Sequence, residues 1–469
     1  MSGPVVIEGA HIAPVSGPDF PDGHLVAVDG RIASVGPGPA PELPGARRVD
    51  GRGRLLTPGL VNTHHHLYQW ATQGMAQSAT LFEWLVELYP VWARIDAEVS
   101  RGTALAGLSW LALSGCTTAA DHLYVFPSGR GDLLAAEIEA AAQVGLRFHP
   151  SRGSMDRGRS EGGLPPDEIV ETTEGALRAT QDAIDAHHDP SPGAMVRVAV
   201  APCSPFSASP RLMTQAAELA RAAGVRLHTH LAETLDEEEQ CRREFGLPPV
   251  AYAEKLGWLG PDVWLAHGVH LSDDALARLA ATGTGVAHCP SSNARLGAGI
   301  ARVTELLRAG VPVGLGVDGA ASSELTPLAG ELRQALLMAR ARLGPTALDA
   351  REALRIGTLG GARCLGREDE IGSLEPGKLA DLALWRVDGF GADVIADPVA
   401  ALVFGPVPPL DLLLVGGRTV VERGELRTVS AQEAASAGAA AHRRLLRGWR
   451  GDERDQRPHG RRIARDSVQ

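Results

Sequence analysis

The chain has 469 residues, of which 44% are hydrophobic and 22% are charged, and its formal net charge is −11 at pH 7. This composition supplies enough apolar material for a large core and is typical of a soluble globular protein. The negative charge argues against nucleic acid as the main partner, and no apolar run approaches the length that spans a membrane.

Five scattered cysteines indicate a reducing compartment. They form no Cys-x-x-Cys pair and no even-numbered framework, so we expect them to be reduced and mostly buried. The first residues also lack a basic segment followed by an apolar stretch. These features predict a cytoplasmic location.

Residues 1–56 are expected to form the first part of a small β-sandwich domain. Short apolar runs at 5–7, 25–28 and 32–35 read as strands, and Asp29-Gly30 between two of them is a hairpin signal. Strand character returns at 379–386 and 412–426, so we expect residues 366–430 to complete the same domain.

Residues 57–365 alternate between strand and helix patterns. Eight runs read as strands, at 55–62, 117–121, 146–150, 196–202, 225–230, 263–267, 284–288 and 312–318. Amphipathic helical stretches separate them, for example at 98–114, 131–144, 209–223, 272–282 and 301–310. Eight such units predict an α/β fold, a (β/α)8 TIM-like barrel whose site lies at the carboxyl ends of its strands.

The last segment, residues 431–469, has a different composition. Residues 431–447 predict an Ala-rich helix, and 448–469 are rich in Arg, Gly and Asp. Charge runs of this kind are usually solvated, so we interpret 448–469 as a disordered tail, with contact to an acidic partner as the alternative.

Histidine pairs fall at two of the predicted strand ends. His64 and His66 follow the first strand, and residues two apart on a strand share a face, so both imidazoles can point at one ion. His228 and His230 end the fifth strand, and either could join them. A His-rich tripeptide alone also occurs in loops and cores, so the metal interpretation depends on these additional residues.

Three further groups occupy corresponding positions. Glu233 lies just past the fifth strand, His267 ends the sixth and Asp318 ends the eighth. Three imidazoles and a carboxylate suit one divalent metal ion, Zn²⁺ first, although Fe²⁺ accepts the same ligands. Because such an ion lowers the pKa of its bound water from ~15.7 towards ~7, the set predicts hydrolysis.

These motifs resemble those of the amidohydrolase superfamily over essentially the full chain. The resemblance is carried by Pro58-Gly59-Leu60-Val61-Asn62-x-His64-x-His66, His230-x-x-Glu233, His267, Val317-Asp318 and the run from Gly372 to Asp381. It implies that one metal ion is bound by His64, His66, His230 and Asp318. It also implies that Glu233 is a proton shuttle and that His267 polarises the hydrolytic water. Binuclear members carry a carboxylated lysine on strand four, and the run 196–202 has no lysine, which favours a single ion.

Within the superfamily, the chain is similar to the cytosine/guanine deaminase-type branch, and most to its 8-oxoguanine deaminases. The segments that carry this likeness are 62–69, 151–155, 160–166, 201–207 and 288–293. It implies deamination of an aminated, purine-like heterocycle, with 8-oxoguanine to urate plus ammonia as the first hypothesis. Asp318 would take a proton from water, Glu233 would protonate the ring nitrogen beside the attacked carbon, and His267 would steady the attacking oxygen.

Substrate contacts are less constrained by the sequence. The amide of Gln69 could pair with a ring edge, and Arg152 could hold a carbonyl or anionic oxygen, with a loop-stabilising hydrogen bond as the alternative for each. Cys203 and Trp70 are further candidates for the pocket wall. Two departures from the 8-oxoguanine deaminase pattern fall in loops expected at the mouth, Thr72-Gln73 and Ser323-Glu324-Leu325.

Two alternatives stay open. The chain could deaminate guanine, isoxanthopterin or an amino-triazine, or dechlorinate a triazine, although the pairing of Glu233 with Asp318 favours deamination. It could also be a non-catalytic binding protein on the same scaffold, which the complete residue set argues against. The expected partner is a small heterocycle, and the resemblance implies a homo-oligomer.

Overall fold

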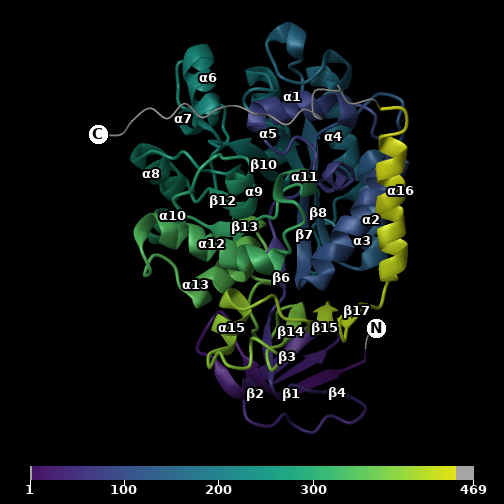
Figure 1. Cartoon of the computed structure of the whole chain (residues 1–469), viewed down its shortest axis with the longest axis vertical. Helices are drawn as coiled ribbons and strands as arrows, with labels where there is room; N and C mark the ends of the chain where they lie inside the picture. The colour runs from purple at the N-terminus through teal and green to yellow at the C-terminus, as the bar shows by residue number, and fades with distance from the viewer. Residues whose placement is uncertain (1–2, 450–469) are drawn as a thin grey trace, which may run out of the picture.

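A closed barrel of eight parallel strands rests on a mixed β-sheet in the computed structural model, which describes residues 3–449 (Figure 1). The barrel strands are β6 Leu60–Asn62, β7 Cys116–Leu123, β8 Arg147–Ser154, β9 Ala199–Pro202, β10 Arg226–Leu231, β11 Val263–His267, β12 Gly285–His288 and β13 Val313–Leu315. They pair in chain order, and β13 closes on β6. The predicted (β/α)8 fold is therefore confirmed.

The first predicted barrel strand, 55–62, is two strands in the structure. β5 (Arg54–Pro58) pairs with β14 (Leu382–Arg386) in the mixed sheet, and only β6 enters the barrel. The chain turns between them at Gly59, where an added Cβ would lie 2.2 Å from the Thr117 side chain. An unbroken apolar run hides this change of sheet because both halves are buried.

The mixed sheet combines strands from both ends of the chain. Its order is β17-β16-β15-β14-β5-β1-β2-β3, and β4 pairs with β1. The hairpin expected at Asp29-Gly30 is present, with φ of 49° and 77° at these two residues, as tight hairpin turns require. The remaining strands are β1 Val5–Ile12, β2 Phe20–Val28, β3 Arg31–Pro37, β4 Arg47–Asp50, β15 Leu410–Val415, β16 Arg418–Glu422 and β17 Glu425–Leu426.

Helices surround the barrel and bury their apolar faces against it. Local signals set their ends: α5 begins after the Ser209 cap, with Pro210 first, and ends at Gly224, which has a φ of 68°. The α-helices are α1 Leu81–Trp92, α2 Ala97–Leu113, α3 Leu133–Val144, α4 Thr173–His187, α5 Pro210–Ala223, α6 Leu235–Phe245, α7 Pro249–Lys255, α8 Asp273–Thr282, α9 Pro290–Arg295, α10 Val303–Arg308, α11 Ala320–Ser323, α12 Leu328–Leu343, α13 Ala350–Arg355, α14 Gly361–Cys364, α15 Pro398–Phe404 and α16 Ala431–Leu445. Shorter turns are η1 Leu67–Thr72, η2 Arg159–Glu161, η3 Asp167–Ile169 and the π-turn η4 Ile356–Gly360.

The C-terminal helix α16 lies along α2 on the outside of the barrel (Figure 1). Its Gly438 allows close approach, since a Cβ there would lie 2.7 Å from Trp70 Nε1. The predicted basic tail falls mainly on residues 450–469, outside the described residues. Among the helices of residues 3–449, none is both long and apolar enough to cross a membrane.

Candidate active site

The predicted site residues meet at the carboxyl ends of the barrel strands. His64 and His66 follow β6, His230 and His267 lie on β10 and β11, and Asp318 follows β13. His267 and Asp318 have φ of 72° and 60°, which is uncommon for residues with a side chain. The chain leaves each strand sharply at these points, and the two side chains turn over the barrel mouth.

Backbone carbonyls fix the ring protons of two histidines. His66 Nδ1 lies 2.7 Å from the carbonyl oxygen of His122, and His230 Nδ1 lies 2.6 Å from that of Cys203. A carbonyl only accepts a hydrogen bond, so both Nδ1 atoms carry the proton. Each ring therefore presents the lone pair of Nε2 to the site.

A relay of two rings fixes His64 in the same way. His228 Nδ1 donates to the carbonyl oxygen of Trp264 at 2.8 Å, which leaves His228 Nε2 as an acceptor. His64 Nδ1 lies 2.8 Å from that Nε2 and therefore donates to it. His228, which sequence reasoning left as an alternative ligand, thus lies behind His64 and orients it.

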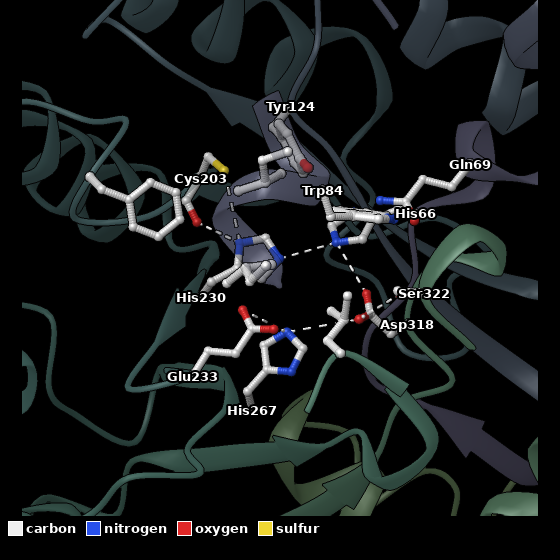
Figure 2. A pocket seen from close by; sticks show the side chains of 14 residues that line it. His66, Gln69, Trp84, Tyr124, Cys203, His230, Glu233, His267, Asp318 and Ser322 are labelled. Carbon is white, nitrogen blue, oxygen red and sulfur yellow. Dashed lines mark hydrogen bonds and ion pairs between the residues drawn. The ribbon is translucent and has the colours of Figure 1, made fainter. Parts of the chain in front are cut away.

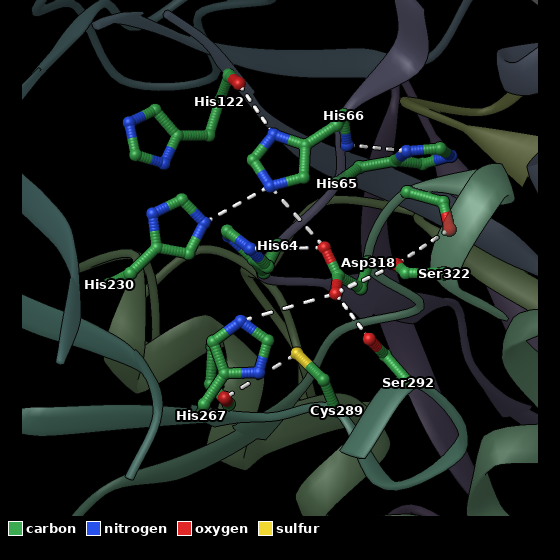
Figure 3. A network of polar contacts seen from close by, with 12 residues as sticks. His64, His65, His66, His122, His230, His267, Cys289, Ser292, Asp318 and Ser322 are labelled. Atoms are coloured by element: carbon green, nitrogen blue, oxygen red, sulfur yellow. Dashed lines mark hydrogen bonds and ion pairs between the residues drawn. The ribbon is translucent and has the colours of Figure 1, made fainter. Parts of the chain in front are cut away.

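The three Nε2 atoms and one carboxylate oxygen converge without a donor between them (Figure 3). His66 Nε2 lies 3.1 Å from His230 Nε2, and Asp318 Oδ1 lies 3.4 Å from His64 Nε2 and 3.3 Å from His66 Nε2. His64 Nε2 is buried and has no hydrogen-bond partner. Burial holds the pKa of all three imidazoles below the ordinary value, so they are neutral lone-pair donors at pH 7. This set fits a divalent cation.

Asp318 is held as a carboxylate. Its Oδ2 accepts hydrogen bonds from Ser292 Oγ at 2.5 Å and Ser322 Oγ at 3.0 Å. Burial alone would raise the pKa of Asp318, but its close contact with His64 and the positive charge of His267 hold that pKa well below its usual range. Asp318 is therefore ionised at neutral pH.

The pKa of Glu233 is shifted in the opposite direction. Burial is the largest influence and raises the pKa of Glu233 to about 7, with Asp318 and Glu237 acting in the same direction against His267. Glu237 fixes its backbone by accepting hydrogen bonds from the N–H groups of Ala232 at 2.8 Å and Glu233 at 3.0 Å. Glu233 thus exchanges a proton near neutral pH.

His267 lies between the two carboxyl groups. Its Nε2 is 3.6 Å from Glu233 Oε2 and 4.0 Å from Asp318 Oδ2, and its Nδ1 is 2.9 Å from Asn293 Oδ1. Burial lowers the pKa of His267, but the two carboxyl groups outweigh that effect and raise it above its ordinary value. Figure 2 shows the three side chains next to one another on the pocket wall.

The pocket above these groups has one strongly apolar side. That side is built by helix α1, by residues from the strand-end loops and by the residue that follows α9, namely Leu81, Trp84, Leu85, Tyr124, Phe206 and Leu296. The polar lining comes from the residues described above and from Gln69 and Ser322. The cavity therefore has the reactive groups at its base and an apolar wall along one side.

Two of the four predicted substrate contacts line this pocket, and two do not. Gln69 and Cys203 are in the lining, whereas Trp70 and Arg152 are not. η1 is a 3-10 helix with three residues per turn, so Trp70 faces away from Gln69 and packs against α16. The guanidinium of Arg152 is already paired with Glu171, at 2.7 and 2.8 Å. Neither Trp70 nor Arg152 is retained as a substrate contact.

Sequence reasoning did not single out His122, Tyr124 or the α1 wall. β7 runs to Leu123, two residues beyond the predicted strand, which brings His122 and Tyr124 to the barrel mouth. The position of a His after Asp121 was a usable signal, because strand ends in a barrel face the site. No comparable signal marks α1, whose sequence reads as an ordinary amphipathic helix.

Comparison with known proteins gives consistent matches. A model of the amidohydrolase family matches residues 55–420. The chain is 45% identical to 8-oxoguanine deaminase from Pseudomonas aeruginosa, over 89% of this chain and 94% of that protein, and 40% identical to isoxanthopterin deaminase from an unknown prokaryotic organism, over 86% and 88%. Its structure is similar to that of atrazine chlorohydrolase from Arthrobacter aurescens TC1 complexed with zinc, with a TM-score of 0.89, 34% identity and coverage of 93% and 100%.

Proposed function

This chain belongs to the amidohydrolase family and is a hydrolase of carbon–nitrogen bonds, and we propose that it deaminates a flat, aminated, purine-like heterocycle. The first candidate reaction is 8-oxoguanine plus water to urate plus ammonia. This choice is supported by the 45% identity to a protein of that activity and by the chemistry of the pocket.

The observation that carries the proposal is the separation of two carboxyl groups by environment. The pKa of Glu233 is raised to about 7, whereas that of Asp318 is held well below its usual range. A pair of acids with separated pKa values supplies one proton donor and one proton acceptor at the same pH. Hydrolytic deamination needs both, because water must lose a proton while the ring and the leaving amine gain one.

We assign the base role to Asp318 and the acid role to Glu233. Asp318 Oδ2 accepts the proton of the attacking water, and Glu233 donates to the ring nitrogen beside the attacked carbon. His267 lies within 4.0 Å of both carboxyl groups and steadies the attacking oxygen. The amino group then leaves as ammonia with the proton that Asp318 accepted. The new hydroxyl group at the attacked carbon becomes a carbonyl by giving its proton to Glu233, so both carboxyl groups return to their starting states.

The metal would be held by the three converging Nε2 atoms and Asp318 Oδ1. We propose one divalent ion, Zn²⁺ first, with His64, His66, His230 and Asp318 as its protein ligands. When bound, such an ion supplies the Lewis acidity that makes water a nucleophile near neutral pH.

The pocket favours a small planar substrate. Trp84, Tyr124 and Phe206 offer faces and edges to a flat ring. Gln69 Oε1 is buried without a hydrogen-bond partner and is placed to accept from a ring N–H group.

Ammonia release from a substrate panel tests the proposal. Zinc-loaded protein is given 8-oxoguanine, guanine, isoxanthopterin and hydroxylated amino-triazines, and a chlorinated triazine is followed by chloride release. We expect the highest kcat/KM with 8-oxoguanine. Chloride release without ammonia would replace deamination by dechlorination, and binding without turnover of any member would favour a non-catalytic role.

A further inference from the structure

Glu324, one of the residues that depart from the 8-oxoguanine deaminase pattern, joins two other segments at the pocket mouth. Its Oε1 accepts hydrogen bonds from Arg295 Nη2 at 3.0 Å and Nε at 3.2 Å. Its Oε2 accepts from the backbone N–H of Gly74 at 2.9 Å. One carboxylate therefore links α9 and the turn after α11 to the loop that follows η1.

Arg295 completes the same connection. Its Nη2 donates to the carbonyl oxygen of Met75 at 3.0 Å, and its Nη1 donates to that of Ala76 at 3.3 Å. We call Arg295, Glu324 and the backbone of 74–76 the mouth clasp. Hydrogen bonds in which both partners are ionised are among the stronger ones, and the Arg295 side chain is only 13% exposed against 37% for Glu324.

Every segment in the clasp adjoins residues that line the pocket. Residues 74–76 connect η1, which holds Gln69, to α1, which supplies Leu81, Trp84 and Leu85. Arg295 directly precedes Leu296, and Glu324 lies two residues after Ser322. The clasp therefore fixes the loop that leads from the polar base to the first turn of α1, while apolar packing holds the rest of that helix.

The clasp also lies next to residues whose backbone conformations are unfavourable on their own. Ala76, Glu324 and Leu325 have φ of 49°, 51° and 66°, in the left-handed region that residues with a Cβ seldom adopt. The carbonyl oxygen of Leu325 accepts from Trp110 Nε1 at 3.2 Å, which secures the far side of this turn. Loss of the ion pair would leave these conformations with fewer contacts and favour a looser mouth.

We infer that the mouth clasp determines specificity: Arg295 and Glu324 hold the α1 wall against the pocket, which limits substrates to flat rings without bulky substituents. This inference rests on the proposed function for the identity of the substrate, but not for the role of the clasp in ordering residues 74–80. Both residues act through the wall that they position.

Two variants and a matched control test the inference. Glu324→Gln removes the charge at nearly unchanged size, and Arg295→Lys keeps the charge but loses the forked geometry. Glu305→Gln is the control, because Glu305 pairs with Arg342 at similar exposure on α10 and α12, elements that contribute no residue to the pocket lining.

Hydrogen exchange of the metal-loaded protein reports on the clasp without any turnover. We expect amides in 74–80 to exchange about tenfold faster or more in both clasp variants, as local opening becomes easier, and to be unchanged in Glu305→Gln. Exchange in 74–80 equal to that of the control would overturn the inference.

Kinetics then test specificity. With the best substrate of the panel, we expect each clasp variant to raise KM by roughly threefold to tenfold, with a smaller change in kcat. The wild type should prefer that substrate over an analogue bearing an N-alkyl group, and in each clasp variant this preference should fall by a similar factor. The double variant should lose little more of this preference than either single variant, because both changes break the same contact. An unchanged preference would overturn the specificity role. If the wild type turns over no panel member, the proposed function fails, whereas the exchange result still decides whether the clasp orders the mouth.

Discussion

Replacing Glu233 by Gln separates proton transfer from substrate binding. With a pKa of about 7, Glu233 is about half protonated at pH 7, whereas a carboxyl group at the ordinary value of 4.5 would be roughly 0.3% protonated. The buried position thus increases the available acid by about two orders of magnitude. Gln fills the same space and can still donate a hydrogen bond, but it transfers no proton. We expect kcat to fall by ~10²–10⁴, the usual contribution of a positioned acid or base.

The dependence of kcat on pH provides a second test of the acid role of Glu233. The acid form of Glu233 is lost as pH rises through about 7, so wild-type kcat should decline on the alkaline side of that value. Ammonia release between pH 5.5 and 9, with metal content measured on the same samples, checks both points. Glu239→Gln, an exposed position on α6, is the control and should match the wild type. A Glu233→Gln enzyme that keeps its metal and works within threefold of wild type, or whose residual activity keeps the alkaline decline, would refute the acid assignment.

Three further outcomes follow from other contacts. A Cβ at Gly319 would lie 1.7 Å from Gln69 Oε1, so Gly319→Ala should displace that amide and lower kcat/KM by about tenfold or more, at unchanged metal content, if Gln69 holds the substrate. Burial raises the pKa of Asp121, which lies beside the Glu137 carboxyl, to about 8. The protonated form of Asp121 therefore stabilises the fold fully below about pH 4, and this stabilisation is lost as pH rises through about 8. Asp121→Asn can still accept a hydrogen bond from the Leu67 N–H and should flatten the decline in Tm between pH 6 and 9, as measured by calorimetry. Stripping the metal with a chelator should abolish turnover and lower Tm, because the ligands converge only in the folded state, and adding Zn²⁺ should restore both; full activity of metal-free protein would contradict the proposed site.

The ring of strands could be predicted from the sequence because parallel strands bury both faces and read as continuous apolar runs. The same property concealed the division of 55–62 into β5 and β6, since neither half exposes a polar face. His64, Asp318 and one of the pair His228 and His230 could be grouped from the sequence, because a barrel collects the carboxyl ends of its strands at one mouth. The choice of His230 within that pair depended on the resemblance to the amidohydrolase superfamily.

Contacts made by loops were not predictable in the same way. The sequence places Trp70 beside Gln69, but in η1 consecutive side chains point about 120° apart. Gln69 therefore lines the pocket while Trp70 packs against α16. Arg152 was a reasonable candidate for an anionic oxygen until the fold brought Glu171 to within 2.7 Å of it. A side chain that finds its partner through tertiary structure leaves no periodic signal in the sequence.

The groups proposed to carry out the reaction and the wall proposed to select the substrate belong to different parts of this chain. His64, His66, His230 and Asp318 are fixed from below by ring protons, backbone carbonyls and serine hydroxyls within the barrel. The apolar wall instead comes largely from α1, which packs into an apolar cluster of its own, and the loop before α1 is joined to α9 and to the turn after α11 by the mouth clasp. Changes in that wall can alter which ring fits without disturbing the groups that move protons. Such a division agrees with the range of similar proteins, which are named for deaminating 8-oxoguanine or isoxanthopterin and for hydrolysing atrazine. The substrate of this chain is therefore better sought by varying residues 74–85, 295–296 and 322–325 than by varying the metal ligands.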